Sequence, residues 1–462
     1  MVLKRTIVAL AGLLLIGLLL GASMLVYASY VVAAVFLLSQ FLTRTWTQSL
    51  SATRNLSAEE LEVGDSAAVR LSLHNTSRLP IVWALVEDLL PAKLLDGPST
   101  ALELSGSHFR VVSIPGGSGK VVVYQLKALR RGYFQLGPVV AETGDLLGLY
   151  KRFSQITAAS YLTVLPKLIP LNGYDIASKR PIGEVKVSYR LMEDPTLISG
   201  IRQYRTGDPI RSIHWRASAR TGELQCKQFE PTSVAGATLV LDMHRDTNPD
   251  EHEPIRTDLA VTAAASICHA LLQIQQQFGL ISNGRDAVDR ISSLGSAEAD
   301  GSRDNGSSGA GDDESTANDQ GDFDSLQSAM AALAMRKSSD RLRPVVIPYG
   351  RGPEHFQTIH RALARLERTD GAHLEDLLLE TQSRLPRDAT VLVILQNVTE
   401  KAAMALGELV RQGYSVAAIV NNYENEALHV AIGRLLSYRI AAYHLHDEES
   451  IPEICKAMVL KY

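Results

Sequence analysis

ATLVLDM, residues 237–243, is a short apolar run of the kind that forms a buried strand. A helical pattern, LAVTAAASICHALLQIQQQF (259–278), follows it, and FGLISNG (278–284) returns to the strand pattern. Strands that alternate with helices predict a mostly parallel sheet with helices on both faces. This stretch therefore predicts a doubly wound α/β domain.

The same alternation continues to the end of the chain, so the predicted α/β domain covers residues 236–462. Further helices are expected at 355–367, at 400–413 and after Glu448, and further strands at 389–397, 414–420 and 439–446. A stretch rich in Gly, Ser, Asp and Asn interrupts the pattern at 296–325. It carries nine acidic residues and one basic residue, Arg303, and almost no apolar side chains. Such a composition predicts a disordered acidic insert.

Residues 55–170 show the pattern of an all-β domain. The segments AAVRLSLHN (67–75), KVVVYQLKAL (120–129) and GYFQLGPVVAE (132–142) alternate apolar with polar residues, between turns rich in Gly, Pro, Asn and Ser. Several short strands of this kind predict a small immunoglobulin-like β-sandwich.

The N-terminus carries no charged residue between Thr6 and Leu42. One helix of that length would measure about 55 Å, nearly twice the thickness of a bilayer's hydrocarbon core. We therefore expect a transmembrane hairpin within residues 1–45, turning at Gly21-Ala22-Ser23. Basic residues flank both ends, which predicts two spans in the inner membrane, in contact with lipid, and a cytoplasmic soluble part. A cleaved signal peptide is the alternative.

Charge and cysteine content exclude some functions. The net charge of −4 gives no electrostatic basis for binding nucleic acid. Cys226, Cys268 and Cys455 are far apart and match no metal or redox spacing, so we expect reduced, mostly buried thiols.

A second distinctive stretch, RQYRTGDPIRSIHWRASARTGEL (202–224), lies in the segment 171–235 and holds five arginines. Asp208-Pro209 predicts a helix start, and Thr221-Gly222 predicts its end. Helical spacing would turn Ile210, Ile213 and Ala217 inward. It would also pair Arg211 with Trp215 on one face and Arg216 with Arg220 on another.

The arginines allow several functions. They could pair with carboxylates and hold the two domains together, dock an acidic partner protein, or bind an anion or anionic lipid. Catalysis has little support, because His214 is the only candidate general base and the stretch offers no nucleophile. We therefore expect no catalytic residue and no enzymatic activity.

The string YRTGDPIRSIHWRASARTGEL resembles the signature of domain-of-unknown-function family 58, a group of bacterial membrane proteins. RRGYFQLGPV, DLLGLY and TVLPKL within 130–166, and PYGRGPEHF (348–356), resemble other landmarks of that family. The residues that match the signature, and that form the predicted interaction site, are Arg205, Gly207, Asp208, Arg211, His214, Trp215, Arg216 and Arg220.

This resemblance implies a function and a fold. Family members are thought to act with MoxR-type AAA+ ATPases, so the chain is expected to be a membrane-anchored adaptor or assembly protein that contacts such an ATPase and other membrane proteins. The C-terminal part of the family is related to von Willebrand factor A domains.

Those domains often hold Mg²⁺ on an Asp-x-Ser-x-Ser motif after the first strand. Here Asp242, His244 and Asp246 occupy these positions, and Asn397 follows the strand predicted at 389–397. Hard cations need several oxygen ligands, so we expect no bound Mg²⁺ and no other cofactor, although Asp242 and Asp246 are the candidate ligands. The alternative function is metal-dependent ligand binding or hydrolysis around Asp242.

Overall fold

The computed structural model describes Gly12, Leu19, Gly21 and residues 23–90, 100–145, 151–171, 193–205, 210–231, 236–289, 344–386 and 389–460. For residues 25, 193–199, 211, 228–231 and 459–460 it describes the backbone alone. The chain divides into two compact units, residues 1–166 with 287–338 and residues 167–286 with 339–462. The predicted acidic insert, 296–325, lies outside the described residues, as does most of the first predicted span.

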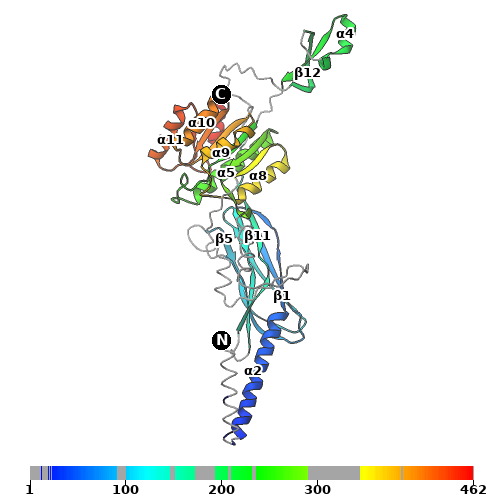
Figure 1. Ribbon diagram of the computed structural model, residues 1–462, viewed down its shortest axis with the longest axis vertical. Helices are drawn as coiled ribbons and strands as arrows, with labels where there is room; N and C mark the ends of the chain where they lie inside the picture. Colours follow the sequence, from blue (N-terminus) through cyan, green and yellow to red (C-terminus); the bar gives the residue numbers. More distant parts are fainter. Residues whose placement is uncertain are drawn as a thin grey trace, which may run out of the picture. The chain divides into compact units, whose positions relative to one another are not determined.

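The first unit begins with the apolar helix α2 (Ser23–Ser49) (Figure 1). Gly21 precedes it with a φ of 63°, a conformation that glycine adopts without strain, at the point where the sequence predicts a turn. The first half of α2 exposes large apolar side chains, including Met24, Val31 and Phe41. Its last turns are buried against β1, β9 and β10, with Trp46 only 2% exposed. One apolar helix thus continues directly into the β-rich part.

Eleven strands follow α2 in the described part of this unit. They are β1 (Leu50–Leu56), β2 (Glu60–Glu62), β3 (Ser66–Asn75), β4 (Ile81–Asp88), β5 (Leu102–Ser105), β6 (Phe109–Ile114), β7 (Gly119–Ala128), β8 (Gly132–Leu136), β9 (Val139–Gly144), β10 (Lys151–Thr157) and β11 (Ser160–Leu165).

These strands form three sheets that share one core. The sheet orders are β1-β3-β7-β5, β10-β9-β4-β6 and β2-β11-β8. Alternate residues of β3 (Ala67, Val69, Leu71, Leu73) and of β7 (Val122, Tyr124, Leu126) are buried, as their alternating sequence predicts. The alternating segment 132–142 forms two strands rather than one. Gly137 has a φ of 79° and turns the chain, so that β8 and β9 lie in different sheets.

The described part of the second unit contains a two-stranded sheet and an α/β domain. In the two-stranded sheet, β12 (Glu193–Gln203) pairs antiparallel with β13 (Gln225–Pro231). Between them lie the 3₁₀ turn η1 (Ile210–Ser212) and the short helix α4 (Trp215–Thr221).

The α/β domain contains a six-stranded sheet in the order β17-β15-β14-β19-β20-β21. The five strands from β15 to β21 are parallel, and β17 is antiparallel at the edge. The bounds are β14 (Gly236–Leu241), β15 (Gln277–Ser282), β17 (Val345–Gly350), β19 (Thr390–Leu395), β20 (Ser415–Val420) and β21 (Ala441–His444). A short ladder joins β16 (Arg285–Asp286) to β18 (Leu366–Glu367).

Helices cover both faces of this sheet, as the sequence predicts (Figure 1). On one face Leu239 and Leu241 pack in a core with α5, α8 and α12, and on the other Val240 packs with α9, α10 and α11. The bounds are α5 (Ile255–Gln273), α8 (Pro353–Arg365), α9 (Leu374–Thr381), α10 (Glu400–Arg411), α11 (Asn425–Ser437) and α12 (Ser450–Leu460), and the 3₁₀ turn η2 (Gln382–Arg384) follows α9.

The strand order places a topological switch point between β14 and β19. The chain passes from β14 through α5 to β15, and then to β17, on one side, and the strands from β19 onward are added on the other side. In open α/β sheets, ligands bind outside the carboxyl ends of the strands at such a point. Asp242, which follows β14, lies at this edge.

Candidate functional site

The loop after β14 is built around the buried carboxylate of Asp242. Its Oδ1 accepts hydrogen bonds from Asn283 Nδ2 (2.8 Å) and from the backbone N–H of His244 (3.2 Å). Asn283, which comes just after β15, also accepts a bond from Met243 N–H through its own Oδ1 (2.7 Å). Asp242 and Asn283 therefore tie the ends of two neighbouring strands together.

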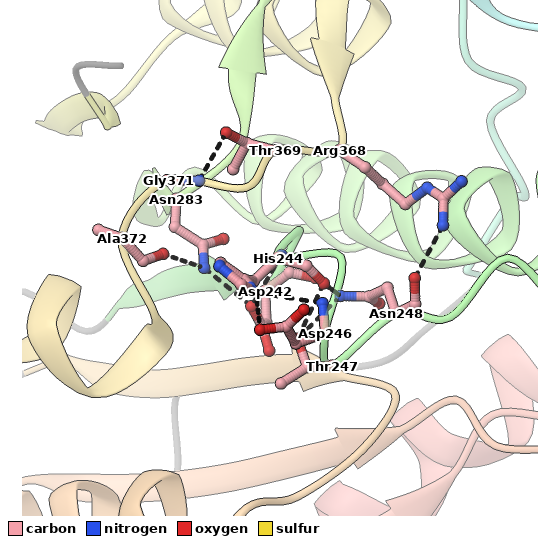
Figure 2. Close-up of polar contacts among 10 residues, drawn as sticks. All are labelled: Asp242, His244, Asp246, Thr247, Asn248, Asn283, Arg368, Thr369, Gly371 and Ala372. Atoms are coloured by element: carbon pink, nitrogen blue, oxygen red, sulfur yellow. Dashed lines mark hydrogen bonds and ion pairs between the residues drawn. The ribbon is translucent and has the colours of Figure 1, made fainter. Parts of the chain in front are cut away.

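The next residues form a closed turn (Figure 2). Thr247 Oγ1 donates to the carbonyl of His244 (3.0 Å), and Asn248 Nδ2 donates to the carbonyls of Asp242 (3.1 Å) and His244 (2.8 Å). Asp246 N–H donates to Nδ1 of His244 (3.2 Å). The polar groups of this buried turn are thus largely satisfied by one another.

A second segment, residues 368–373, runs beside this turn and is fixed to it. Arg245 N–H donates to the carbonyl of Thr369 (2.9 Å), and Thr369 N–H donates to the carbonyl of Met243 (3.0 Å). Arg368 bonds the carbonyl of Asn248 and the carboxylate of Asp250, both at 2.7 Å. Sequence reasoning missed this segment and Asn283, because nothing in the sequence near Asp242 indicates their proximity.

The surroundings of Asp242 consist of hydrogen-bond donors, whereas a Mg²⁺ site needs oxygen acceptors. Burial raises the pKa of the Asp242 carboxyl, and the groups that donate to its Oδ1 are the side-chain N–H of Asn283 and the backbone N–H of His244. At the end of β19, Asn397 Oδ1 already accepts a bond from Asn422 Nδ2 (2.8 Å). Mg²⁺ needs several oxygen acceptors directed at one point in near-octahedral geometry. The residues around Asp242 do not fit that ion.

The Arg-rich stretch folds differently from the expected continuous helix. The turn η1 ends at Ser212, Ile213 bridges to Cys226, and a helix begins only at Trp215. The chain breaks there because His214 is bound to β13: its N–H donates to the carbonyl of Gln225 (2.7 Å). The predicted stop is confirmed, since Gly222 caps α4 with a φ of 74°.

The predicted inward face is therefore only partly correct. Ile213 is buried, but Ile210 is 74% exposed and Ala217 is half-buried. Trp215, expected on a face with Arg211, is the first residue of α4 and is 65% exposed. The i, i+4 pairing of Arg211 with Trp215 fails because the helix does not span both residues.

The signature residues have different environments. Arg205, Arg216 and Arg220 are exposed, and Arg216 and Arg220 make no ion pair within the described part of the chain. Gly207 and Asp208 lie outside the described residues, so the predicted Asp208 cap does too. For Arg211 the structure describes the backbone only.

The remaining candidates for chemistry have structural roles. His214 Nδ1 accepts the backbone N–H of Ala217 (3.1 Å) and so caps α4. The three cysteines are free and buried, as predicted. Burial raises the pKa of Cys268, and it raises that of Cys455 to about 12, so these thiols are poor nucleophiles.

Comparisons with known proteins agree with the resemblance over part of the chain. Residues 200–299, which include α4, β13, β14, α5 and β15, match the family model "Protein of unknown function DUF58". The "Uncharacterized protein YeaD" of Bacillus subtilis (strain 168) is 25% identical over 241 residues. The match spans 52% of this chain and 57% of that relative.

The similar solved structures match only part of this chain, and their TM-scores are low. The CARDB domain of the PF1109 protein from Pyrococcus furiosus has 12% identity and a TM-score of 0.17, and the match covers 25% of this chain and 91% of that one. Proximal thread matrix protein 1 from the mussel byssus has 8% identity and a TM-score of 0.29, with 49% of this chain and 46% of that chain covered. These scores support no specific fold assignment.

Proposed function

We propose that this protein is a membrane-anchored adaptor that docks a MoxR-type AAA+ ATPase through the surface of α4. The observation that carries the proposal is the pair Arg216 and Arg220, two exposed guanidinium groups without an ion pair among the described residues. Exposed arginines beside an exposed indole are typical of a protein interface, where Arg and Trp contribute most binding energy.

The surroundings of these arginines are also apolar and accessible. Trp215 is 65% exposed, Ile210 is 74% exposed and Leu224 is 46% exposed. All three lie in the segment that connects β12 to β13. The docking surface is defined here as Ile210, Trp215, Arg216, Arg220 and Leu224. It suits an acidic partner surface with an apolar centre.

The attachment to the membrane is the second element of the proposal. Two N-terminal spans in the inner membrane, turning at Gly21, place α2 in lipid, which suits its exposed apolar half. Basic residues at both ends favour a cytoplasmic soluble part, where the ATPase is available. The β-rich part is proposed to be immunoglobulin-like, and the α/β domain to be von Willebrand factor A-like.

A hydrolytic function at Asp242 has weaker support. Its carboxylate is 4% exposed and accepts hydrogen bonds from neighbouring donors, so it is neither accessible to a substrate nor arranged as a Mg²⁺ ligand. The hydroxyl of Thr247 in the same loop is buried and donates to the carbonyl of His244, so it is not available as a nucleophile.

Charge reversal tests the adaptor proposal. The full-length protein in detergent, carrying Arg216→Glu and Arg220→Glu together, should keep its melting temperature but lose at least about tenfold in affinity for the ATPase. Wild-type binding should weaken as salt rises, because exposed charges are screened. Lys401→Glu, an exposed charge reversal on α10, is the matched control and should bind normally. A folded double variant that keeps full affinity would refute the docking surface.

A further inference from the structure

The turn after β14 and the segment before α9 bring three potential metal ligands together. One ligand atom from each of His244, Asp246 and His373 lies within 4.8 Å of the other two. The two imidazole rings have centroids 3.9 Å apart with an angle of 33° between their planes. Asp246 Oδ2 lies 3.8 Å from His244 Nδ1. Two imidazoles and one carboxylate thus lie close to one another.

The backbone holds this cluster in place. Thr369 is bonded on both sides to the turn after β14, and Gly371 N–H donates to Thr369 Oγ1 (3.1 Å). The carbonyl of Ala372 accepts a bond from Asn283 Nδ2 (3.0 Å), which fixes the residue directly before His373 (Figure 2). Metal affinity benefits from ligands that are positioned before the ion arrives.

The hydrogen bond of His244 also bears on metal binding. Its Nδ1 accepts the N–H of Asp246 (3.2 Å). A lone pair of Nδ1 therefore points to the side of the Asp246 carboxylate. The ion would replace that one hydrogen bond. Asp246 is exposed, so water can then accept its N–H.

One distance already fits a tetrahedral site, whereas the separation of the two imidazole rings must increase. Bonds of about 2.0–2.1 Å in a tetrahedral site place neighbouring ligand atoms about 3.4 Å apart. The 3.8 Å between His244 Nδ1 and Asp246 Oδ2 is close to that value. Two imidazoles on one tetrahedral ion have ring centroids about 5 Å apart. The rings of His244 and His373 are 3.9 Å apart, so the half-buried His373 ring must swing away by about 1 Å. The Asp246 side chain is 77% exposed and can adjust to the ion.

We propose that His244, Asp246 and His373 bind a divalent transition metal ion of the Zn²⁺ class. Imidazole ligands favour Zn²⁺, Cu²⁺ and Ni²⁺ over Mg²⁺, which prefers oxygen. Asp242 is not a ligand, because it is buried and bonded to Asn283 and His244. With three protein ligands, the remaining coordination position is open to water or to an acidic group of a bound molecule. This site is independent of the docking surface on α4.

Metal titration of the full-length protein tests the proposal. After chelator treatment and dialysis, calorimetry should show saturable binding of one Zn²⁺ per chain, with no comparable binding of Mg²⁺. Co²⁺ should give visible absorption of the intensity typical of four-coordinate sites. The His373→Ala and Asp246→Ala variants should each lose at least about tenfold in Zn²⁺ affinity.

Two control variants remove residues of the same types that are not proposed ligands. His429→Ala removes an exposed histidine on α11, and Asp370→Ala removes an exposed carboxylate in the same segment as His373. Both should bind Zn²⁺ as the wild type does. The proposal is overturned if no saturable binding occurs, or if His373→Ala and Asp246→Ala bind as tightly as the two controls. Both ligand variants should keep the wild-type circular dichroism spectrum, which shows that lost binding is not lost folding.

Discussion

Asn283 Nδ2 lies 2.8 Å from Asp242 Oδ1, and both residues are almost completely buried. The partner of the buried carboxylate is therefore a neutral amide rather than a cation. A buried charge without an opposite charge is costly, so burial raises the pKa of Asp242. The carboxylate at the switch point thus holds the loop in place through its hydrogen bonds. Burying its ionised form lowers the free energy of unfolding, and this loss depends on pH.

This cost predicts how stability changes with pH. Because the folded state holds the proton more tightly than the unfolded state, Asp242 contributes most stability below the unfolded pKa of about 3.9. That contribution is lost as pH rises through the raised folded pKa. The Asp242→Asn variant should remove this dependence and be more stable than the wild type at neutral pH.

Urea denaturation of both proteins at several pH values between 4 and 8 measures the difference. Asp370→Asn is the control, because the Asp370 side chain is exposed, and its stability profile should follow that of the wild type. A profile for Asp242→Asn that is parallel to the wild type across this range would contradict the prediction.

A second buried charge lies in the β-rich part and does have an opposite partner. Arg54 forms an ion pair with Asp88, and the two side chains are 3% and 0% exposed. Arg54 Nη1 also donates to the carbonyl of Leu136 (2.8 Å) and to Ser160 Oγ (2.9 Å), and Tyr124 OH donates to Asp88 (2.6 Å). Arg54→Ala should lower the free energy of unfolding by about 3–5 kcal/mol, because Asp88 is left buried and unpaired.

The surface pair Lys127–Glu103 provides the comparison. Its nitrogen and oxygen are 3.7 Å apart, and its side chains are 50% and 59% exposed. Lys127→Ala should therefore change stability by no more than about 1 kcal/mol. Tyr124→Phe, which leaves Asp88 with one donor fewer, should fall between the two at about 1–3 kcal/mol. Equal losses for Arg54→Ala and Lys127→Ala in chemical denaturation would disprove this ranking.

Two glycines within helices of the α/β domain should respond to alanine in opposite directions. A Cβ at Gly407 in α10 would lie 2.8 Å from Cγ of Tyr438, whereas a Cβ at Gly433 in α11 meets no atom within 4 Å. Gly407→Ala should destabilise by about 1–3 kcal/mol through overpacking. Gly433→Ala should stabilise by about 0.5–1 kcal/mol, because alanine loses less backbone entropy in a helix. A melting temperature for Gly407→Ala that is not lower than that of the wild type would show that Tyr438 moves freely.

The sequence predicts the α/β domain well because local patterns determine its elements. The apolar runs at β14 and β19 have no other way to bury both faces than inside a helix-covered sheet. The short helix α4 is predicted poorly for the converse reason. Its start depends on the bond from His214 N–H to Gln225, which lies on a strand that comes later in the chain.

The candidate metal ligands show the same division. His244 and Asp246 are two residues apart in the sequence and are easily recognised as a group. His373 is far along the chain, and only the pairing of Thr369 with the turn after β14 brings it to His244. Contacts across a sheet edge depend on the complete topology, so a linear pattern cannot reveal them.

The final prediction concerns the membrane. In the described part of the chain two helices are long and apolar enough to span a bilayer, but 78% of the window in α5 is buried in the α/β core, against 17% in α2. We therefore propose that α2 lies in lipid and α5 does not. The first predicted span, which precedes α2, is proposed to lie in lipid as well.

A fluorescent reporter that folds in the cytoplasm should be active after Tyr462, and an alkaline phosphatase fusion at the same position should be inactive. Replacing Lys4 and Arg5 with Gln should reduce this orientation bias, because the basic flanks set it. Phosphatase activity in the wild-type fusion would instead favour a cleaved signal peptide or a single span, and the proposed access to a cytoplasmic ATPase would be wrong.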